Sequence, residues 1–261
     1  MKPALTDAQL DRYARHILLR QIGGAGQRKL LDAAVLVVGA GGIGAPALLY
    51  LAAAGVGRIG IVDDDTVALS NLQRQILYAT GEVGTAKLDA AARRLTALNP
   101  DARIEPHRVR LNAANAAALI GPYDLVLDGC DNFETRFAVS DACVALGKPL
   151  VSAAIGEFDG QIAVFRPDGR ERPCYRCFVP EAPQGAAACT EQGVVGALAG
   201  TIGAWAALET VKEIAGFGES LAGHLVLFDG LAAETRKVRL RRDPACPACR
   251  GPLGSVRAGA V

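Results

Sequence analysis

The chain has 261 residues, of which 51% are hydrophobic, enough for one large α/β domain or two small ones. Its formal net charge is +1, so no strong field attracts nucleic acid or a membrane surface, and we expect neither as a partner. The longest apolar run, residues 193–208, is short for a membrane span and rich in glycine and alanine, which favours a buried helix.

Two short helices are expected at the N-terminus. Apolar residues recur at helical spacing between residues 6 and 18, the glycines at 23–26 break the pattern, and a second helix continues to residue 31. The opening residues carry no signal-peptide pattern, so we expect a cytoplasmic protein with reduced cysteines.

A strand–loop–helix–strand unit follows. Residues 34–38 predict a buried strand, the loop Gly39-x-Gly41-x-x-Gly44 follows it, a helix covers 45–54, and a second strand at 58–62 ends at Asp63. Glycines let the backbone approach a phosphate, the helix N-terminus offers free N–H groups, and Asp63 is placed to bind ribose hydroxyls. This pattern predicts a nucleotide site but leaves NAD and ATP both open.

The remaining elements predict a Rossmann-like, doubly wound sheet. Helices at 87–98 and 136–146 alternate with strands at 103–109, 125–127 and 149–153, as in a parallel sheet. Further strands are expected at 160–165, 225–228 and 235–240, and such neighbours can pair antiparallel and extend the sheet. We therefore predict one continuous α/β domain over residues 1–261.

Polar side chains suited to phosphate chemistry cluster around the predicted strand ends. Residues 70–75 read Ser-Asn-Leu-Gln-Arg-Gln, Lys87 begins a helix, and Asp131 follows the strand at 125–127. Cations there stabilise charge on a phosphate and a carboxylate holds Mg²⁺, whereas hydride transfer needs neither. Each residue also has an ordinary explanation: Arg74 as a surface arginine, Lys87 as a surface helix residue and Asp131 as a helix cap.

Four of the seven cysteines have the spacing of a structural zinc site. They form the pairs Cys174-x-x-Cys177 and Cys246-x-x-Cys249, each beside a proline that suits a tight turn. The pairs lie far apart in sequence, so Zn²⁺ would tie the C-terminal segment to the middle of the chain. Four protein ligands leave no open position, so the expected role is structural; disulfides or redox pairs are the alternatives.

The other cysteines have separate explanations. Cys130 and Cys143 are expected to be small buried side chains. Cys189 follows a Pro/Ala/Gly-rich stretch at 180–188 and is a candidate nucleophile, because an exposed thiol near a helix start has a lowered pKa.

Several motifs together resemble the ThiF/MoeB/HesA family, bacterial relatives of the ubiquitin-activating enzymes. The resemblance covers nearly the whole chain and rests on the glycine loop, Asp63-Asp64-Asp65-Thr66-Val67, the Ser-Asn-Leu-Gln-Arg-Gln run, Asp128-Gly129-Cys130-Asp131-Asn132, the cysteine pairs and Arg12-Tyr13-x-Arg15. It implies that the C-terminal carboxylate of a ubiquitin-like sulfur-carrier protein ending in Gly-Gly attacks the α-phosphate of Mg-ATP. Pyrophosphate leaves, and an acyl-adenylate remains.

The resemblance also implies roles for individual residues. Asp63 would bind ribose, Asn71, Arg74 and Lys87 the phosphates, and Asp131 the Mg²⁺. Arg15 would reach into the site of a partner subunit, which makes a homodimer the active unit, and some members bond the activated carrier through a cysteine at the place of Cys189. The full expected nucleotide set is Gly39, Gly41, Gly42, Gly44, Asp63, Ser70, Asn71, Gln73, Arg74, Lys87, Asp131 and Asn132.

The chain is then expected to divide into a helical arm at 1–32, a nucleotide-binding half at 33–153, a carrier-binding and zinc half at 154–252, and a tail at 253–261. The carrier for molybdopterin synthesis is favoured over the carrier for the thiazole of thiamine. No rhodanese-like extension follows Cys249, so a separate protein is expected to donate sulfur. An NAD-dependent oxidoreductase and a nucleotide-binding scaffold without turnover remain as alternatives from other classes.

Overall fold

The computed structural model describes residues 4–167, 172–183 and 193–250. In the first part the elements are α1 (Asp7–Arg12), α2 (Ala14–Ile17), α3 (Gly23–Asp32), β1 (Ala34–Val38), α4 (Gly44–Ala53), β2 (Arg58–Val62), α5 (Lys87–Leu98), β3 (Arg103–His107), α6 (Ala116–Ile120), β4 (Leu125–Asp128) and α7 (Phe133–Leu146). The second part adds β5 (Leu150–Ile155), β6 (Asp159–Phe165), α8 (Tyr175–Phe178), α9 (Gly196–Ala215), β7 (His224–Asp229) and β8 (Glu234–Arg239).

One sheet runs through the whole protein, as the sequence predicts. Its strand order is β3-β2-β1-β4-β5-β6-β7-β8. The five strands β1 to β5 pair in parallel, and β5 to β8 pair antiparallel. The order reverses direction between β1 and β4, where an open α/β sheet places its ligand crevice.

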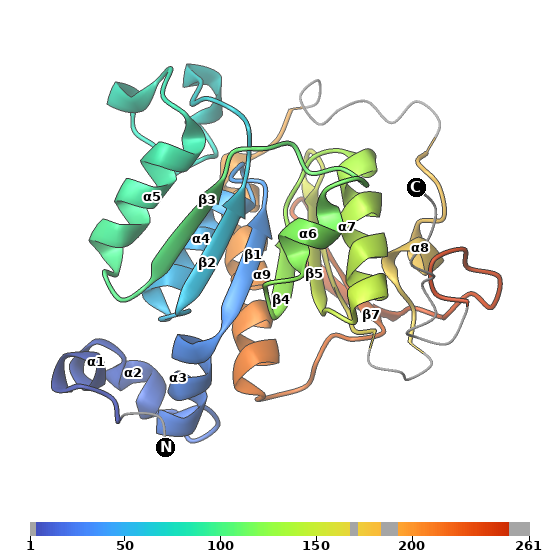
Figure 1. The fold of residues 1–261 in the computed structure, drawn as a ribbon. Coiled ribbons are helices and arrows are strands. Elements are labelled where there is room, and N and C mark those ends of the chain that lie inside the picture. The colour runs from blue at the N-terminus through green and yellow to red at the C-terminus, as the bar shows by residue number, and fades with distance from the viewer. Residues whose placement is uncertain (1–3, 168–171, 184–192, 251–261) are drawn as a thin grey trace.

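Helices cover both faces of the sheet and define two hydrophobic layers (Figure 1). On one side α4, α5 and α9 pack Leu48, Leu95 and Ile202 into the larger cluster. On the other side α6 and α7 pack Ile120 and Val139 over β1 and β4. Because both faces are covered, all five residues of β1 and all four of β4 are buried, which explains their continuous apolar sequence.

The N-terminal arm differs in detail from the expected pair of helices. The first helix is interrupted at Tyr13, and the glycines at 23–26 form the first turn of α3 instead of a break. Gly26 is needed there because a Cβ at this position would lie 2.9 Å from Ile22 Cγ2. A buried network anchors the arm to the core: Asn99 Nδ2 donates to the Tyr13 hydroxyl at 2.8 Å and to the carbonyl of Ala52 at 2.7 Å.

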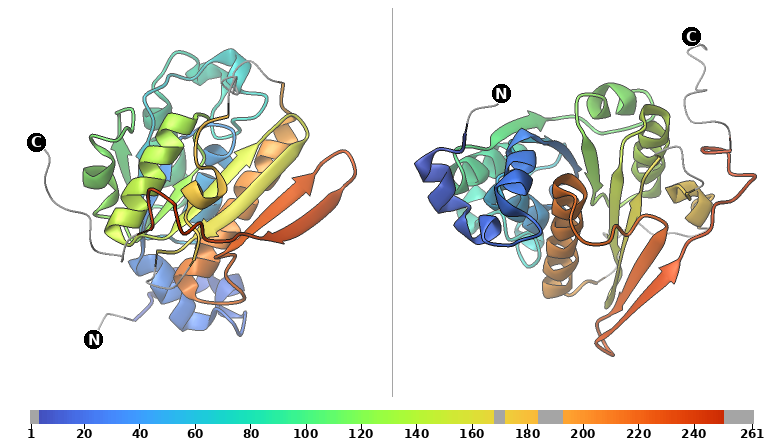
Figure 2. Two further views of the ribbon diagram at one scale, coloured as in Figure 1. Left: turned by 90° about the vertical axis from the view of Figure 1, so that its right-hand side faces the viewer. Right: turned by 90° about the horizontal axis from the view of Figure 1, so that it is seen from below.

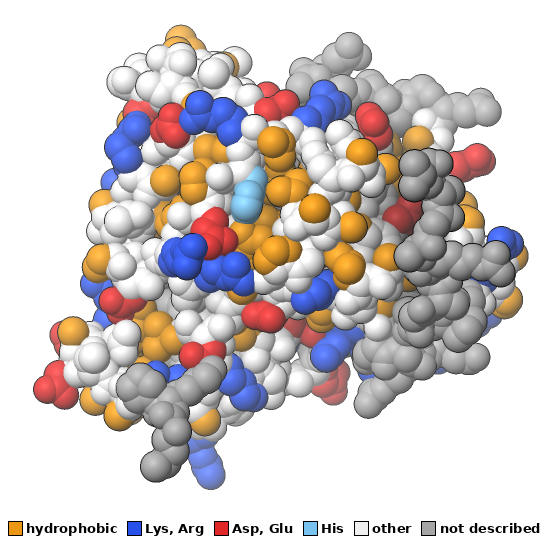
Figure 3. Space-filling model, in the orientation of Figure 1, with side chains coloured by type: hydrophobic (Ala, Val, Ile, Leu, Met, Phe, Trp, Pro, Cys, Tyr) orange, Lys and Arg blue, Asp and Glu red, His pale blue; other side chains and the backbone are white. Residues whose placement is uncertain are grey.

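The opposite end of the sheet is less covered. The β7–β8 hairpin projects beyond the helices (Figure 2), and every residue of β8 is exposed. None of the helices described is long and apolar enough to cross a membrane. Positive and negative side chains are interspersed on the face shown in Figure 3, in keeping with the near-zero net charge.

Candidate active site and metal centre

The register of the central strands brings three loops to one edge of the sheet. Val38 at the end of β1 pairs with Val62 of β2 and with Asp128 of β4. The residues that follow these strands therefore lie side by side around a cavity of about 710 Å³. Small-molecule sites have volumes of about 300–1,000 Å³, so the cavity is large enough for a nucleotide.

The glycine loop forms one wall of this cavity, which Gly39, Gly41 and Gly42 line. Gly39 has a φ of +87°, a backbone conformation that favours glycine. Gly44 permits the tight entry into α4, because a Cβ there would lie 1.8 Å from the carbonyl oxygen of Gly39. The Tyr78 hydroxyl donates to the Ala40 carbonyl at 2.9 Å and holds the loop in place.

Asp63 is fixed beside the glycine loop at the end of β2. Its Oδ2 accepts the Ala40 N–H at 2.8 Å, and its Oδ1 accepts the Asp65 N–H at 2.9 Å. Burial raises the pKa of Asp63, and the positive charge of Lys87 only partly opposes this effect. Each oxygen keeps acceptor capacity for a further hydrogen bond, which suits a pair of ribose hydroxyls.

Two cations lie on the same side of the cavity. Lys87, the first residue of α5, is buried, and its ammonium donates to Asp65 Oδ2 at 2.7 Å. Arg74 packs against the glycine loop, where a Cβ on Gly42 would lie 3.5 Å from Arg74 Cδ. The interpretation of these residues as ordinary surface cations is therefore wrong for Lys87, and Arg74 lies in the cavity wall.

Asp131 and Asn132 occupy the loop between β4 and α7, and both line the cavity. Asn132, not Asp131, caps α7: its side-chain oxygen accepts the Thr135 N–H at 2.9 Å. The alternative interpretation of Asp131 as a helix cap is thus wrong. Its exposed carboxylate lies in the cavity wall, and carboxylate oxygens are ligands that Mg²⁺ accepts.

The four paired cysteines converge where α8 meets the segment that follows β8. Their Sγ atoms all lie within 4.8 Å of one another, with Cys174–Cys177 at 3.9 Å, Cys174–Cys246 at 3.6 Å and Cys177–Cys249 at 3.4 Å. Four sulfurs bound to zinc at about 2.3 Å in a tetrahedron are about 3.8 Å apart, so this cluster fits Zn²⁺. Among the residues described, no fifth thiol belongs to this group, and a closed Cys₄ set is structural.

Comparison with known proteins assigns the family. The model of the ThiF family matches residues 13–248. The chain belongs to the ThiF family. It is 51% identical to the sulfur carrier protein adenylyltransferase of Thermus thermophilus over 94% of this chain and 92% of that protein. It is 45% identical to the SAMP-activating enzyme E1 of Haloferax volcanii over 98% and 95%.

Other matches are partial or show the fold alone. The adenylyltransferase and sulfurtransferase MOCS3 of Anopheles gambiae is 47% identical over 94% of this chain but only 56% of its own length. The crystal structure of E. coli MccB with MccA-N7isoASN superposes with a TM-score of 0.82 at 21% identity, covering 94% of this chain and 76% of that one. This last likeness supports the architecture of the ThiF-family chain and nothing more.

Within this ThiF-family chain, most of the expected nucleotide set meets in the cavity. Asn71 joins the residues described above, whereas Gly44, Ser70 and Gln73 do not line it. Arg15 is exposed on α2 and lies outside the cavity of its own chain. Cys189 falls outside the described residues.

Residues that the sequence did not single out complete the cavity. Arg136 and Tyr175 line it from α7 and α8, and Gln161 lines it from β6. The position of Arg136, one helical turn after Asn132, was a usable signal for the first of them. Tyr175 lies between two zinc ligands in sequence, and only the folded structure shows that its side chain reaches the nucleotide cavity.

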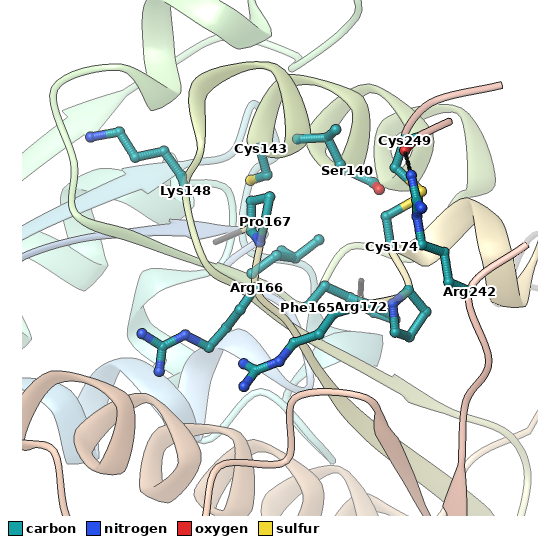
Figure 4. Close-up of a pocket in the computed structure, with 13 residues that line it drawn as sticks. Ser140, Cys143, Lys148, Phe165, Arg166, Pro167, Arg172, Cys174, Arg242 and Cys249 are labelled. Atoms are coloured by element: carbon teal, nitrogen blue, oxygen red, sulfur yellow. Dashed lines mark hydrogen bonds between the residues drawn. The ribbon is translucent and has the colours of Figure 1, made fainter. Parts of the chain in front are cut away.

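The zinc-binding segment packs tightly on α7. Arg176 makes a bidentate ion pair with Asp141, with N–O distances of 2.8 and 3.1 Å for Nε and 2.8 Å for Nη2, and stacks over Phe137. Figure 4 shows the small pocket beside the cluster, in which Arg242 points to the carbonyl of Cys249 and donates to it at 2.5 Å. Positive side chains beside the cluster would offset the negative charge of four metal-bound thiolates.

The two remaining thiols described, Cys130 and Cys143, belong to the hydrophobic layer on the α6 and α7 side of the sheet. Cys130 and Cys143 are buried, as the sequence predicts, and burial raises the pKa of both. A thiol with a raised pKa is a poor nucleophile at neutral pH.

Proposed function

We propose that this chain uses ATP to adenylate the C-terminal carboxylate of a ubiquitin-like sulfur-carrier protein. The observation that carries the proposal is the single cavity in which the glycine loop, Asp63, Arg74, Lys87 and Asp131 meet. A family match over residues 13–248 and adenylyltransferase relatives that the chain spans almost completely support it. The three relatives compared above are all named as adenylating or activating enzymes, and none supports the NAD-dependent oxidoreductase.

The side chains of the cavity bind ATP at three places. Asp63 accepts hydrogen bonds from the ribose, and the N–H groups of the glycine loop and of α4 face the phosphates. Arg74 and Lys87 neutralise the charge on pyrophosphate as it leaves, and Asn71 donates a hydrogen bond to it. With the α-phosphate fixed, the carrier carboxylate attacks it, so positioning and charge neutralisation are the chain's contribution to rate.

The donors present also fit Mg²⁺ and Zn²⁺. Asp131 supplies a carboxylate oxygen, a ligand that Mg²⁺ prefers, and the metal would neutralise phosphate charge there. The four cysteines would hold Zn²⁺ away from the cavity, where it fastens the C-terminal segment to α8. On this basis we propose a nucleotide-binding half at 33–153 and a carrier-binding and zinc half at 154–252, with residues of the second half also lining the nucleotide cavity.

Arg15 leads to the proposal of a homodimer. It is exposed and does not line its own cavity, so it acts, as the family resemblance implies, in the cavity of a second copy. A mixture of the Arg15→Ala and Asp131→Ala variants tests this, because a mixed dimer regains one intact site. Activity above the sum of the two inactive variants supports the exchange of Arg15, and none contradicts it.

For the carrier we favour the small subunit of molybdopterin synthase, with the thiazole-forming carrier of thiamine synthesis as the alternative. The matches to MOCS3 proteins give the first choice its support, since those names join adenylation to sulfur transfer. A separate protein then delivers the sulfur to the acyl-adenylate.

ATP–pyrophosphate exchange with purified carriers tests the function. We expect radioactive pyrophosphate to enter ATP only when a carrier ending in Gly-Gly is present, and a carrier that lacks the last glycine is the matched control. No exchange with any such carrier would refute the proposal. Tight binding of NAD in place of ATP would favour the oxidoreductase, and exchange rates for the two carriers decide between the pathways.

A further inference from the structure

Arg136 is a buried arginine in the first turn of α7, 7% exposed, at the wall of the nucleotide cavity. Its Nη2 donates to the carbonyl of Cys130 at 2.5 Å. A guanidinium gives a short, charge-assisted hydrogen bond of this kind a fixed direction. Burying an arginine costs free energy unless its donors are satisfied, and Arg136 also hydrogen-bonds with the side chain of Tyr175.

The carbonyl that Arg136 binds belongs to the peptide group that joins Cys130 to Asp131. A peptide group is planar, so fixing its oxygen also fixes its N–H and the direction in which the chain enters Asp131. The side chain of Asp131 has little support of its own. Among the residues described, its carboxylate receives one long hydrogen bond, from Asn132 Nδ2 at 3.4 Å.

Other hydrogen bonds hold the loop residues before and after Asp131. The Gly129 N–H donates to the Val38 carbonyl at 3.0 Å, and the Cys130 N–H donates to Asp128 Oδ1 at 3.0 Å. After Asp131, Asn132 is fixed as the cap of α7. The hydrogen bond from Arg136 to the Cys130 carbonyl adds a contact at the peptide group directly before Asp131.

We propose that Arg136 is a positioning residue that orients Asp131 for the divalent metal of Mg-ATP. The inference rests on the proposed function, since it assumes that Asp131 meets the metal. Groups that orient a metal-binding carboxylate typically change metal affinity by about 10- to 100-fold when removed. Arg136 acts through the Cys130 carbonyl, so its loss weakens metal binding and leaves the binding of metal-free nucleotide in place.

The experiment measures Mn²⁺ binding by electron paramagnetic resonance, with a non-hydrolysable ATP analogue bound to the whole protein. Arg136→Met is expected to raise the dissociation constant of Mn²⁺ by about tenfold or more, and Arg136→Lys, which keeps a donor, by less. The concentration of Mg²⁺ that half-saturates pyrophosphate exchange should rise in parallel. The affinity of the analogue without metal should stay at the wild-type value.

Arg58→Met is the matched control. Arg58 also donates to a backbone carbonyl, that of Pro122, and lies at the start of β2. We expect this variant to bind Mn²⁺ as the wild type does. If Arg136→Met does not fold, Arg136→Lys and Arg136→Gln carry the same comparison.

The outcomes separate this proposal from the proposed function. Wild-type Mn²⁺ affinity in a folded Arg136 variant would overturn the positioning role, as would a large loss of metal-free nucleotide binding, which indicates direct contact with ATP. The Asp131→Asn variant is the reference for the metal site: unchanged Mn²⁺ binding there removes the premise. Failure of exchange in the wild-type protein rejects adenylation itself.

Discussion

The two ends of the sheet are stabilised by different means. In β1 and β4 every residue is buried between two helical layers, whereas every residue of β8 is exposed. The parallel end therefore has a core that fixes its strands, and the antiparallel end has little apolar area to hold its last hairpin. The four-cysteine cluster lies at the second end, where Cys246 follows β8 closely and joins Cys174.

This difference explains where the chemistry is placed. Loops that follow buried parallel strands inherit a fixed position, so Gly39, Asp63 and Gly129 can meet with little freedom. At the antiparallel end we infer that Zn²⁺ held by the four cysteines would supply the missing restraint. We therefore expect the two ends to respond separately to changes that remove the core contacts or the metal.

The largest effect is expected from removal of zinc. Structural zinc contributes about 10 kcal/mol or more in small domains, and here a loss of about 5 kcal/mol would lower the Tm by about 10–20 °C. Hydrogen exchange should show lost protection in β7, β8 and α8 and retained protection in β1 and β4. Cys249→Ser should act like the chelator, and Cys143→Ala, which removes a buried thiol outside the cluster, should not. An unchanged Tm after verified metal removal contradicts the zinc assignment.

Loss of the Asp131 carboxylate should be the largest change in rate. Asp131→Ala is expected to lower pyrophosphate exchange by about 10³-fold or more, while its Tm stays near the wild-type value because the side chain is exposed and does not cap α7. Asn132→Ala is the matched variant, since it removes the cap and should cost about 1 kcal/mol of stability. Near-normal exchange in Asp131→Ala would argue against its role with Mg²⁺.

Most of the fold follows from the sequence because its signals are local. Continuous apolar strands and the glycine loop predict the parallel sheet, and the short strands after residue 154 predict its antiparallel extension, which the structure confirms. The arm was less predictable. Glycine is a weak helix former, yet Gly26 lies inside α3 because the packing of Ile22 allows no larger side chain.

The sequence predicts the site residues that directly follow strands. It does not predict those whose side chains reach the cavity from other elements. Arg74 and Lys87 were placed by the rule that strand ends share a crevice, and Cys174 and Cys246 by ligand spacing. Arg136 gives only the weaker signal of its place one helical turn after Asn132. Tyr175 gives none, because its position in the cavity wall depends on how α8 packs. Tertiary contacts between distant segments are what a single sequence does not display.

Two glycines of the loop should separate a packing role from a ligand-binding role. Gly44→Ala places a Cβ against the Gly39 carbonyl and should destabilise the parallel end by several kcal/mol, about as much as a severe core change. Gly41→Ala meets only Gln75 Nε2, at 3.8 Å, so the protein without nucleotide should keep its Tm. The KM for ATP should nevertheless rise about tenfold, because the added methyl occupies the space that a phosphate approaches. Equal Tm values for the two variants contradict this assignment, as does an unchanged KM for Gly41→Ala.

The smallest expected effect is the pH dependence of Asp63. Its pKa is raised, mainly by burial, so it takes up a proton at a higher pH than an ordinary aspartate. As the pH falls through this raised pKa, the ribose loses its ionised acceptor and the KM for ATP should rise, by less than the limit of about tenfold per pH unit for one proton. The stability contribution of the same group has the opposite sign: the folded protein binds the proton more tightly than the unfolded chain, so protonation at low pH favours the fold.

Asp63→Asn should have a high KM for ATP at every pH and should lose this component of the pH profile. A KM that rises in the variant over the same pH range would assign the titration to another group.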